Sequence, residues 1–202
     1  MIYHRRARGV SHRDGRTRGL APEADHQHDL TVRSVGGVMR RAATAKKRAI
    51  LEAALDVLRS AGIDAFSVEG VARRASVAKG LVIYHYGSRA QLLRACATAL
   101  ARERAERFAA RRRGGGIRGI DATWEELRRQ TSDGTTRAWL GLAAAGVMIA
   151  EPGITDSDDV ARASLLDGCA AALAAGTPEP LVREAHDVLW LALLRILEAD
   201  EV

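Results

Sequence analysis

The chain has 202 residues, 47% of them apolar, so it is long enough and apolar enough to bury one or two cores. This apolar share excludes a disordered chain. Aromatic residues make up only 4% while Ala, Leu and Arg abound, which favours helices over sheets. The net charge of +6 is unevenly spread: residues 40–113 hold 17 basic and 6 acidic residues, whereas residues 114–202 hold 7 and 15. We therefore expect an all-α protein with a basic block that faces a polyanion and an acidic block with another role.

The cysteines and the apolar runs argue against a secreted or membrane protein. Cys96 and Cys169 match no metal or redox spacing, so we expect two core thiols and no cofactor. The N-terminus lacks the apolar core of a signal sequence, and the longest apolar stretch, residues 138–150, is too short to cross a bilayer. We expect a cytoplasmic protein without membrane contact.

Residues 1–38 mix Arg, Gly, His and Asp without a helical or strand period, so we expect this segment to be disordered. One interpretation is a basic arm that adds phosphate contacts. The other, which we favour, is a start placed too early, with Val35, Val38 or Met39 as the natural one. The organised pattern begins only after Met39.

The first predicted helix begins near Thr44. Its apolar positions, Leu51, Ala54, Leu55 and Leu58, fall on one helical face, and Gly62 supplies the left-handed stop.

Two short helices follow at the spacing of a helix-turn-helix. Ser67 is a good N-cap for a helix that ends near Ala75, and only residues 76–78 separate it from a second helix that runs through Tyr84. This connection holds two helices at a steep angle. The sequence therefore predicts a helix-turn-helix between about Ser67 and Tyr86.

A long helix is predicted next. Gly87 interrupts the pattern, and Ser88 with Gln91 gives the spacing of a capping box that opens a helix towards Arg113. The glycines of residues 114–116 are not a phosphate-binding loop, because no strand precedes them and no Lys-Ser/Thr follows. We interpret them as a linker.

The acidic block is predicted to contain further helices. Four segments carry helical patterns: Asp121–Thr131, Thr135–Ala150, Asp156–Ala175 and Glu179–Ala199. The last two are apolar enough to form a buried pair, and helices this apolar in a small domain often continue their core into a second subunit. We expect domains at residues 44–104 and 114–202, the second serving dimerisation and ligand binding.

Several motifs of the basic block resemble the TetR family of bacterial regulators. They are Arg48-Ala-Ile-Leu-x-Ala-Ala, Gly62, Phe66-Ser-Val, Val71-Ala and Val77-Ala-Lys-Gly-Leu-Val-Ile-Tyr-His-Tyr-Gly-Ser-Arg-x-x-Leu-Leu93. The match covers roughly residues 44–100, and its signature spans nearly 30 consecutive residues. The resemblance implies a three-helix DNA-binding domain joined by a long helix to a smaller helical domain.

The resemblance places the second helix of the helix-turn-helix in the major groove. There Lys79 would donate to guanine or to phosphate, Leu81 would touch a thymine methyl group, and Gly80 would let the backbone approach closely. A basic stretch at the start of the first helix would cross the DNA backbone. The candidate DNA contacts are Arg48, Ser67, Lys79, Gly80, Leu81, Tyr84, His85, Ser88 and Arg89.

The chain departs from the family pattern at several positions. The usual Tyr is Ile83, the usual Ser is Ala78, and the usual turn Gly is Ser76. Because Ile83 lacks a hydroxyl group, we expect Tyr84 to make the phosphate contact instead. Tyr86, at the usual Phe position, is interpreted as a core residue.

The resemblance also implies a small-molecule site in the C-terminal domain. The large side chains that would line it are Trp124, Trp139, Met148 and Trp190. Core packing is the stronger interpretation for each of them taken singly. About 89 residues follow residue 113, which is short for such a domain, so the pocket is expected to be reduced or absent.

Two other classes of function compete with a regulator. An enzyme would need a nucleophile and base in contact, but His186 and Asp187 are adjacent in a helix and should point in different directions. A helical-bundle interaction protein without specific DNA binding is opposed by the basic surface around Lys79 and Arg89. We expect a regulator and no enzyme, and the resemblance implies a homodimeric repressor that a small molecule releases from a palindromic operator.

Overall fold

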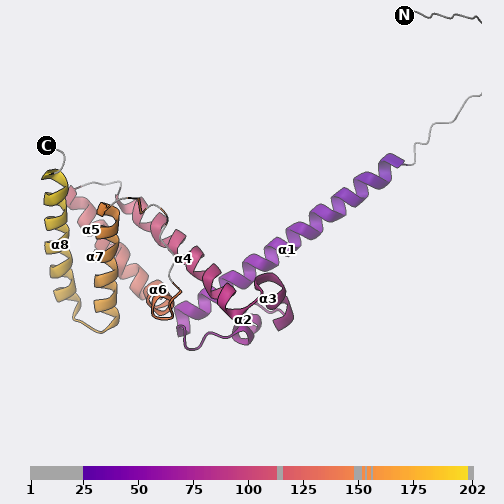
Figure 1. Cartoon of the computed structure of the whole chain (residues 1–202), viewed down its shortest axis with the longest axis horizontal. Coiled ribbons are helices and arrows are strands. Elements are labelled where there is room, and N and C mark those ends of the chain that lie inside the picture. The colour runs from indigo at the N-terminus through magenta and orange to yellow at the C-terminus, as the bar shows by residue number, and fades with distance from the viewer. Residues whose placement is uncertain (1–24, 113–115, 148–151, 153, 156, 200–202) are drawn as a thin grey trace, which may run out of the picture. The chain divides into compact units, whose positions relative to one another are not determined.

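The computed structural model describes residues 25–112, 116–147, 152, 154–155 and 157–199, and every regular element in these ranges is an α-helix. Figure 1 shows their order along the chain. The chain divides into two units after Ala42, and the packing described below lies within residues 43–202. The all-α fold class predicted from the sequence is confirmed.

Helix α1 (Asp25–Ala61) begins earlier than the sequence predicts. Residues 25–38 were expected to be disordered because they lack an apolar period, yet they are helical. An apolar face is needed for packing but not for helix propagation, since each residue added to an existing helix completes one further hydrogen bond. Residues 1–24 of the predicted disordered segment, including the proposed basic arm, lie outside the described residues.

One core joins the C-terminal half of α1 to the next three helices, α2 (Val68–Arg74), α3 (Lys79–Tyr86) and α4 (Arg89–Arg112). Of the four apolar positions predicted for α1, Leu51 is half-buried and the other three are buried, and Ile50 and Ala53 are buried in addition. The central residues of this core are Ile50, Ala54, Leu58, Val71, Val82, Leu92, Leu93 and Cys96. The C-terminal half of α1 and the two short helices α2 and α3 thus surround one end of α4.

The turn between α2 and α3 contains Ser76 in the left-handed region, with φ +53°. A β-carbon is unfavourable there, because it approaches the following carbonyl oxygen. The β-carbon of Ser76 therefore makes this turn a point of local strain.

The C-terminal part of the chain holds α5 (Gly116–Ser132), α6 (Thr135–Ala144), α7 (Ser157–Ala174) and α8 (Glu179–Ala199). The bounds of α8 are as predicted. Helix α5 begins five residues earlier than expected, and α6 ends at Ala144 because Gly146 adopts φ +70°. Helices α7 and α8 pack side by side, and α5 packs against both (Figure 1).

Helix α6 packs against the N-terminal core as well as against the C-terminal helices. Its buried residues Ala138, Trp139 and Leu142 belong to the cluster formed by α1, α2, α3 and α4. Two smaller clusters, centred on Trp124 and Trp190, hold α5, α7 and α8 together. The two predicted domains therefore share a core through α6.

None of the described helices combines the length and apolar character needed to span a bilayer. Within the described ranges, no group of three His, Cys, Asp or Glu side chains is arranged to hold a metal ion.

Replacing Ser76 by glycine should stabilise the protein, because it removes the β-carbon from a left-handed residue. The relief, less the extra freedom that glycine gives the unfolded chain, should raise the free energy of unfolding by about 0.5–1 kcal/mol. The exposed Ser164 in the middle of α7 is the matched control. Ser164→Gly should lower the free energy of unfolding by about 0.5 kcal/mol in urea titrations, and a loss of stability in Ser76→Gly would contradict the strain.

Candidate nucleic-acid interface

Helix α3 turns one side to solvent. Lys79, Gly80, Ile83 and Tyr84 are exposed and lie on one face at helical spacing, and the Tyr84 side chain is 80% exposed. Val82, on the other side, is 1% exposed and anchors the helix in the core. We call Lys79, Gly80, Ile83 and Tyr84 the reading face.

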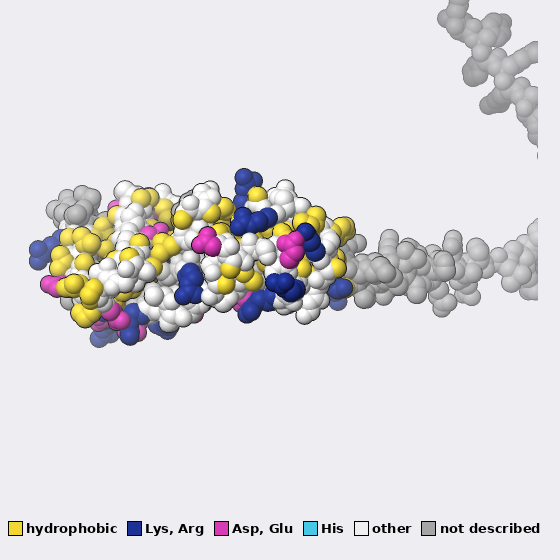
Figure 2. Space-filling model, turned by 90° about the horizontal axis from the view of Figure 1, so that it is seen from below, with side chains coloured by type: hydrophobic (Ala, Val, Ile, Leu, Met, Phe, Trp, Pro, Cys, Tyr) yellow, Lys and Arg dark blue, Asp and Glu magenta, His cyan; other side chains and the backbone are white. Residues whose placement is uncertain are grey.

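Lysine and arginine side chains are spread over the part of the molecule that contains the helix-turn-helix. Figure 2 shows them on the face seen from below, with apolar side chains gathered at the end formed by the C-terminal helices. Acidic side chains lie among the basic ones at both ends of this face, so the charge separation of the sequence does not appear there as two separate patches.

Lys79 is paired with Glu69, in the first turn of α2. A side-chain hydrogen bond from Lys79 is the main cause that lowers the pKa of Glu69, so this carboxylate stays ionised. Both side chains are more than half exposed. A nucleic acid that binds Lys79 must therefore compete with an exposed and weakly held ion pair.

The other predicted contacts on α3 are partly buried. Leu81 packs against the N-terminal core, and His85 meets the Tyr84 ring edge to face, with the centroids 5.1 Å apart. The Tyr86 hydroxyl donates to the Lys47 carbonyl oxygen over 2.7 Å, and burial raises the pKa of Tyr86 to about 12. Leu81 therefore lies on the side of α3 that faces the core. Ile83 is the apolar side chain on the reading face.

The two predicted serine contacts cap helices. Ser67 Oγ accepts from the Gly70 N–H over 3.0 Å at the start of α2, and Ser88 Oγ accepts from the Gln91 N–H over 3.2 Å at the start of α4. The two caps fix the orientation of α2 and α4, which flank α3.

Two predicted arginine contacts lie outside α3, Arg48 in α1 and Arg89 at the start of α4. Arg89 Nε donates to the Phe66 carbonyl oxygen over 3.2 Å and its guanidinium lies over the Phe66 ring. Arg48 pairs with Glu52 one turn along α1 at 3.4 Å, and its side chain is 77% exposed. Arg89 therefore stabilises the loop before α2, whereas Arg48 stays exposed to solvent in a surface ion pair.

Trp139, a predicted ligand contact, is buried and bonded to other residues of the chain. Its indole N–H donates to Asp167 of α7 at 3.1 and 3.2 Å, and the guanidinium of Arg104 lies 4.5 Å from the centre of its ring. Arg104 is itself buried and contacts Asp167 at 2.5 Å. This buried group links α4, α6 and α7 and was not predicted from the sequence.

Trp124 and Trp190 lie on either side of the buried His186. The ring centroids of the two tryptophans are 5.4 and 5.7 Å from that of the histidine. His186 Nδ1 lies 3.0 Å from Asp187 Oδ1, so these neighbours meet, contrary to prediction, because the short aspartate side chain bends along the helix surface. His186 Nε2 has no hydrogen-bond partner among the described residues.

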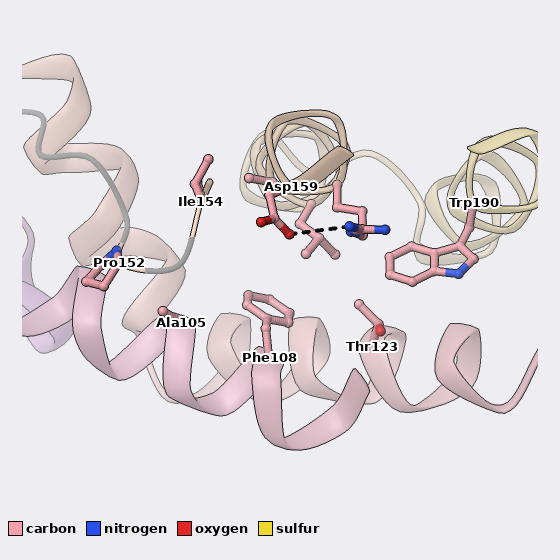
Figure 3. Close-up of a pocket in the computed structure, with 10 residues that line it drawn as sticks. Ala105, Phe108, Thr123, Pro152, Ile154, Asp159 and Trp190 are labelled. Carbon is pink, nitrogen blue, oxygen red and sulfur yellow. Dashed lines mark hydrogen bonds and ion pairs between the residues drawn. The ribbon is translucent and has the colours of Figure 1, made fainter. Parts of the chain in front are cut away.

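A small cavity lies beside Trp190. Figure 3 shows Phe108 of α4 and Trp190 of α8 directed into it, with Asp159 bonded to the neighbouring Arg162 at 3.3 Å. Its volume is about 40 Å³, room for a few water molecules. Trp190 is the predicted ligand residue that lines it, while Met148 lies outside the described residues.

Comparisons with known proteins found one family model and solved structures that resemble this chain. Residues 50–96 match the family model described as bacterial regulatory proteins, tetR family. A TetR family transcription regulator from Marinobacter aquaeolei VT8 shares the fold at a TM-score of 0.55 and 17% identity, over 76% of this chain and 97% of the other. A protein assigned to the same family from Rhodococcus sp. gives a TM-score of 0.44 at 19% identity, over 74% and 97%. No curated protein sequence matches the chain significantly.

His186 should make stability depend on pH. Burial lowers its pKa from the ordinary value of 6.5, against the opposing effect of Asp187, so the folded state favours the neutral ring. Below pH 6.5 the histidine of the unfolded chain binds a proton more readily than that of the folded chain. The free energy of unfolding therefore decreases as the pH decreases.

This prediction is tested by urea titrations of wild type and His186→Phe between about pH 8 and about pH 5. The wild type should lose stability more steeply than the variant as the pH falls. Parallel curves would contradict the role of His186.

Proposed function

We propose that this protein is a sequence-specific DNA-binding regulator of transcription, since residues 50–96 match the family model of tetR-type bacterial regulatory proteins. The observation that carries the proposal is the reading face of α3. It combines a cation, a glycine, an apolar side chain and a tyrosine on one exposed side of a short, well-anchored helix. These are the groups that read base edges and phosphates in a major groove.

Each residue of the reading face has a role in the proposed complex. Lys79 exchanges Glu69 for guanine O6/N7 or a phosphate, Ile83 contacts a thymine methyl group, and Tyr84 donates to a phosphate or a base edge. A β-carbon at Gly80 would meet nothing within 4 Å, so packing within the chain does not require glycine there. In the proposed complex, glycine at this position lets the DNA backbone approach α3 closely.

Contacts to the DNA backbone come from the flanks of the reading face. Arg48 is exposed and contributes charge without reading sequence. Ser67, Ser88 and Arg89 stand at the starts of α2 and α4, where backbone N–H groups attract phosphate. His85, beside Tyr84, completes the set of proposed contacts.

We propose that the protein acts as a homodimer through α7 and α8. One side of α8 buries Val182, His186 and Trp190, whereas the other exposes an apolar stripe. The stripe consists of Leu181, Ala185, Val188, Leu189 and Ala192. Beside it runs an apolar groove of about 340 Å³ between α7 and α8. A second copy, related by a two-fold axis, would cover both in a four-helix arrangement.

The dimer would place two copies of α3 in successive major grooves of a palindromic operator in the cytoplasm and so repress transcription nearby. A ligand that releases it must suit a cavity of about 40 Å³, whereas pockets for drug-sized ligands measure roughly 300–1,000 Å³. We therefore propose a small effector, held beside Trp190 and Arg162, that favours a dimer with a half-site spacing unsuited to the operator.

Genomic fragments retained by the purified protein at moderate salt should share a palindrome, which sequencing would reveal. Lys79→Ala and Tyr84→Ala should each weaken binding to it roughly 10- to 100-fold, because a base-edge or phosphate contact is lost. Arg118→Ala, which removes an exposed arginine from α5, is the matched control and should bind as the wild type does. Salt-sensitive retention without a shared sequence would contradict specific reading and leave an interaction protein as the alternative.

Placing a charge on the apolar stripe should separate the subunits. Leu189→Glu is expected to raise the dissociation constant of the dimer roughly 100-fold or more, since a carboxylate would be buried without a partner. Analytical ultracentrifugation measures this directly. Thr98→Glu adds the same charge at an exposed position of α4 and should leave the dimer intact, and equal behaviour of the two variants would refute this interface.

A further inference from the structure

The C-terminal end of α1 is held by a side chain of α6. Arg137 Nη1 donates to the carbonyl oxygens of Arg59 and Ser60 over 2.9 and 3.0 Å. The last carbonyl groups of a helix lack partners within the helix, and they carry the negative end of its dipole. A guanidinium is therefore well suited to hold this end of α1.

The turn between α5 and α6 approaches the same end of α1 at backbone distance. Gly134 has φ +81°, and a β-carbon added to it would lie 2.3 Å from the Arg59 carbonyl oxygen. No flexible side chain can yield there, since the clash is with backbone. The turn and α1 therefore meet as two rigid segments.

Ion pairs close a ring around this contact. Arg59 of α1 pairs with Glu103 of α4 at 2.5 Å, Glu103 pairs with Arg107 at 2.7 Å, and Arg107 reaches Asp133 in the α5–α6 turn at 2.8 Å. The ring thus returns to the residue before Gly134. It joins three elements that are far apart in the sequence.

The junction is polar where it faces solvent. A groove of about 350 Å³ runs along it, lined by charged and hydroxyl side chains of α1, α2 and the α5–α6 turn. Apolar burial of Trp139 and Leu142 holds α6 against the core on its other side, but such burial is not directional. The hydrogen bonds of Arg137 are directional and so define an angle.

We propose that Arg137 is a positioning residue that fixes the angle of the helix-turn-helix relative to the C-terminal helices. The role rests on the proposed function, because in the dimer this angle sets the distance between the two reading faces and hence the operator half-site spacing. Helix α6 also carries Trp139, which is bonded to Asp167 of α7. One short helix therefore connects the C-terminal helices to the end of α1.

The test uses the full-length protein and a set of operators whose half-sites are one or two base pairs closer or further apart. Each added base pair turns one half-site by about 36° in B-DNA, so wild type should favour one spacing by at least roughly tenfold. Arg137→Ala should reduce that preference to less than about threefold while keeping the base preference within each half-site. Arg137→Lys should restore much of it, since an ammonium group can donate to the same carbonyls.

Arg128→Ala is the matched control, because Arg128 lies on α5 and pairs with Glu125 and Glu179, away from α1. It should keep the spacing preference of the wild type. An unchanged preference in Arg137→Ala would overturn the positioning role, as would an equal loss in Arg128→Ala.

A second measurement does not depend on DNA. Spin labels at Arg73→Cys in α2 and Glu125→Cys in α5, both exposed positions, report the distance between the helix-turn-helix and the C-terminal helices by pulsed electron resonance. Adding Arg137→Ala should broaden the distance distribution, and an unchanged one would overturn the proposal. If the wild type retained no specific fragment, the proposed function would fail, while this distribution would still decide the role of Arg137.

Discussion

The burial of Val82 determines which side of α3 faces solvent, and the proposed DNA recognition depends on that orientation. With Val82 in the core and Leu81 and Tyr86 packed beside it, Lys79, Ile83 and Tyr84 have to point outward. The core itself comes from α1, α2 and α4, whose buried residues close around this short helix. A helix of eight residues has little stability alone, so its reading face exists only because the neighbouring helices hold it.

The same core reaches the C-terminal helices through α6. Three kinds of contact meet on or beside this helix: the apolar contacts of Trp139 and Leu142, the pair of the buried Arg104 with the half-buried Asp167, and the hydrogen bonds of Arg137. Reading DNA and joining subunits occur at different ends of residues 43–202 in the proposed mechanism. Because α6 contacts α4 as well as α5 and α7, a structural change in the C-terminal helices would reach the helix-turn-helix through α6.

The sequence predicted the helix-turn-helix well because its signals are local. The caps at Ser67 and Ser88 and the apolar spacing of α1 and α2 need only a few neighbouring residues, and the structure has them as expected. The side of α3 that faces outward was predicted less well. Leu81 and Ile83 are both apolar, and only the packing of α3 against the other helices decides which of them is exposed.

Contacts between distant segments were beyond local reasoning. Nothing in the pattern of α6 indicates that Trp139 would bond Asp167 or that Arg137 would reach the end of α1, because the partners lie 28 and 78 residues away. The early start of α1 was not predicted for a different reason. Residues 25–38 extend an existing helix without packing a face, so their sequence has no apolar period that could reveal the helix. The charge distribution was informative, in contrast, because the basic part of the sequence, residues 40–113, is the part that contains α3.

The most direct test of the account is a crystal structure of the protein bound to a DNA fragment that it selects. The account predicts α3 in the major groove, with Lys79, Ile83 and Tyr84 in contact with base edges or phosphates, and two copies of the chain joined through α7 and α8. A complex in which DNA lies against another surface, with the reading face of α3 left in solvent, would contradict it.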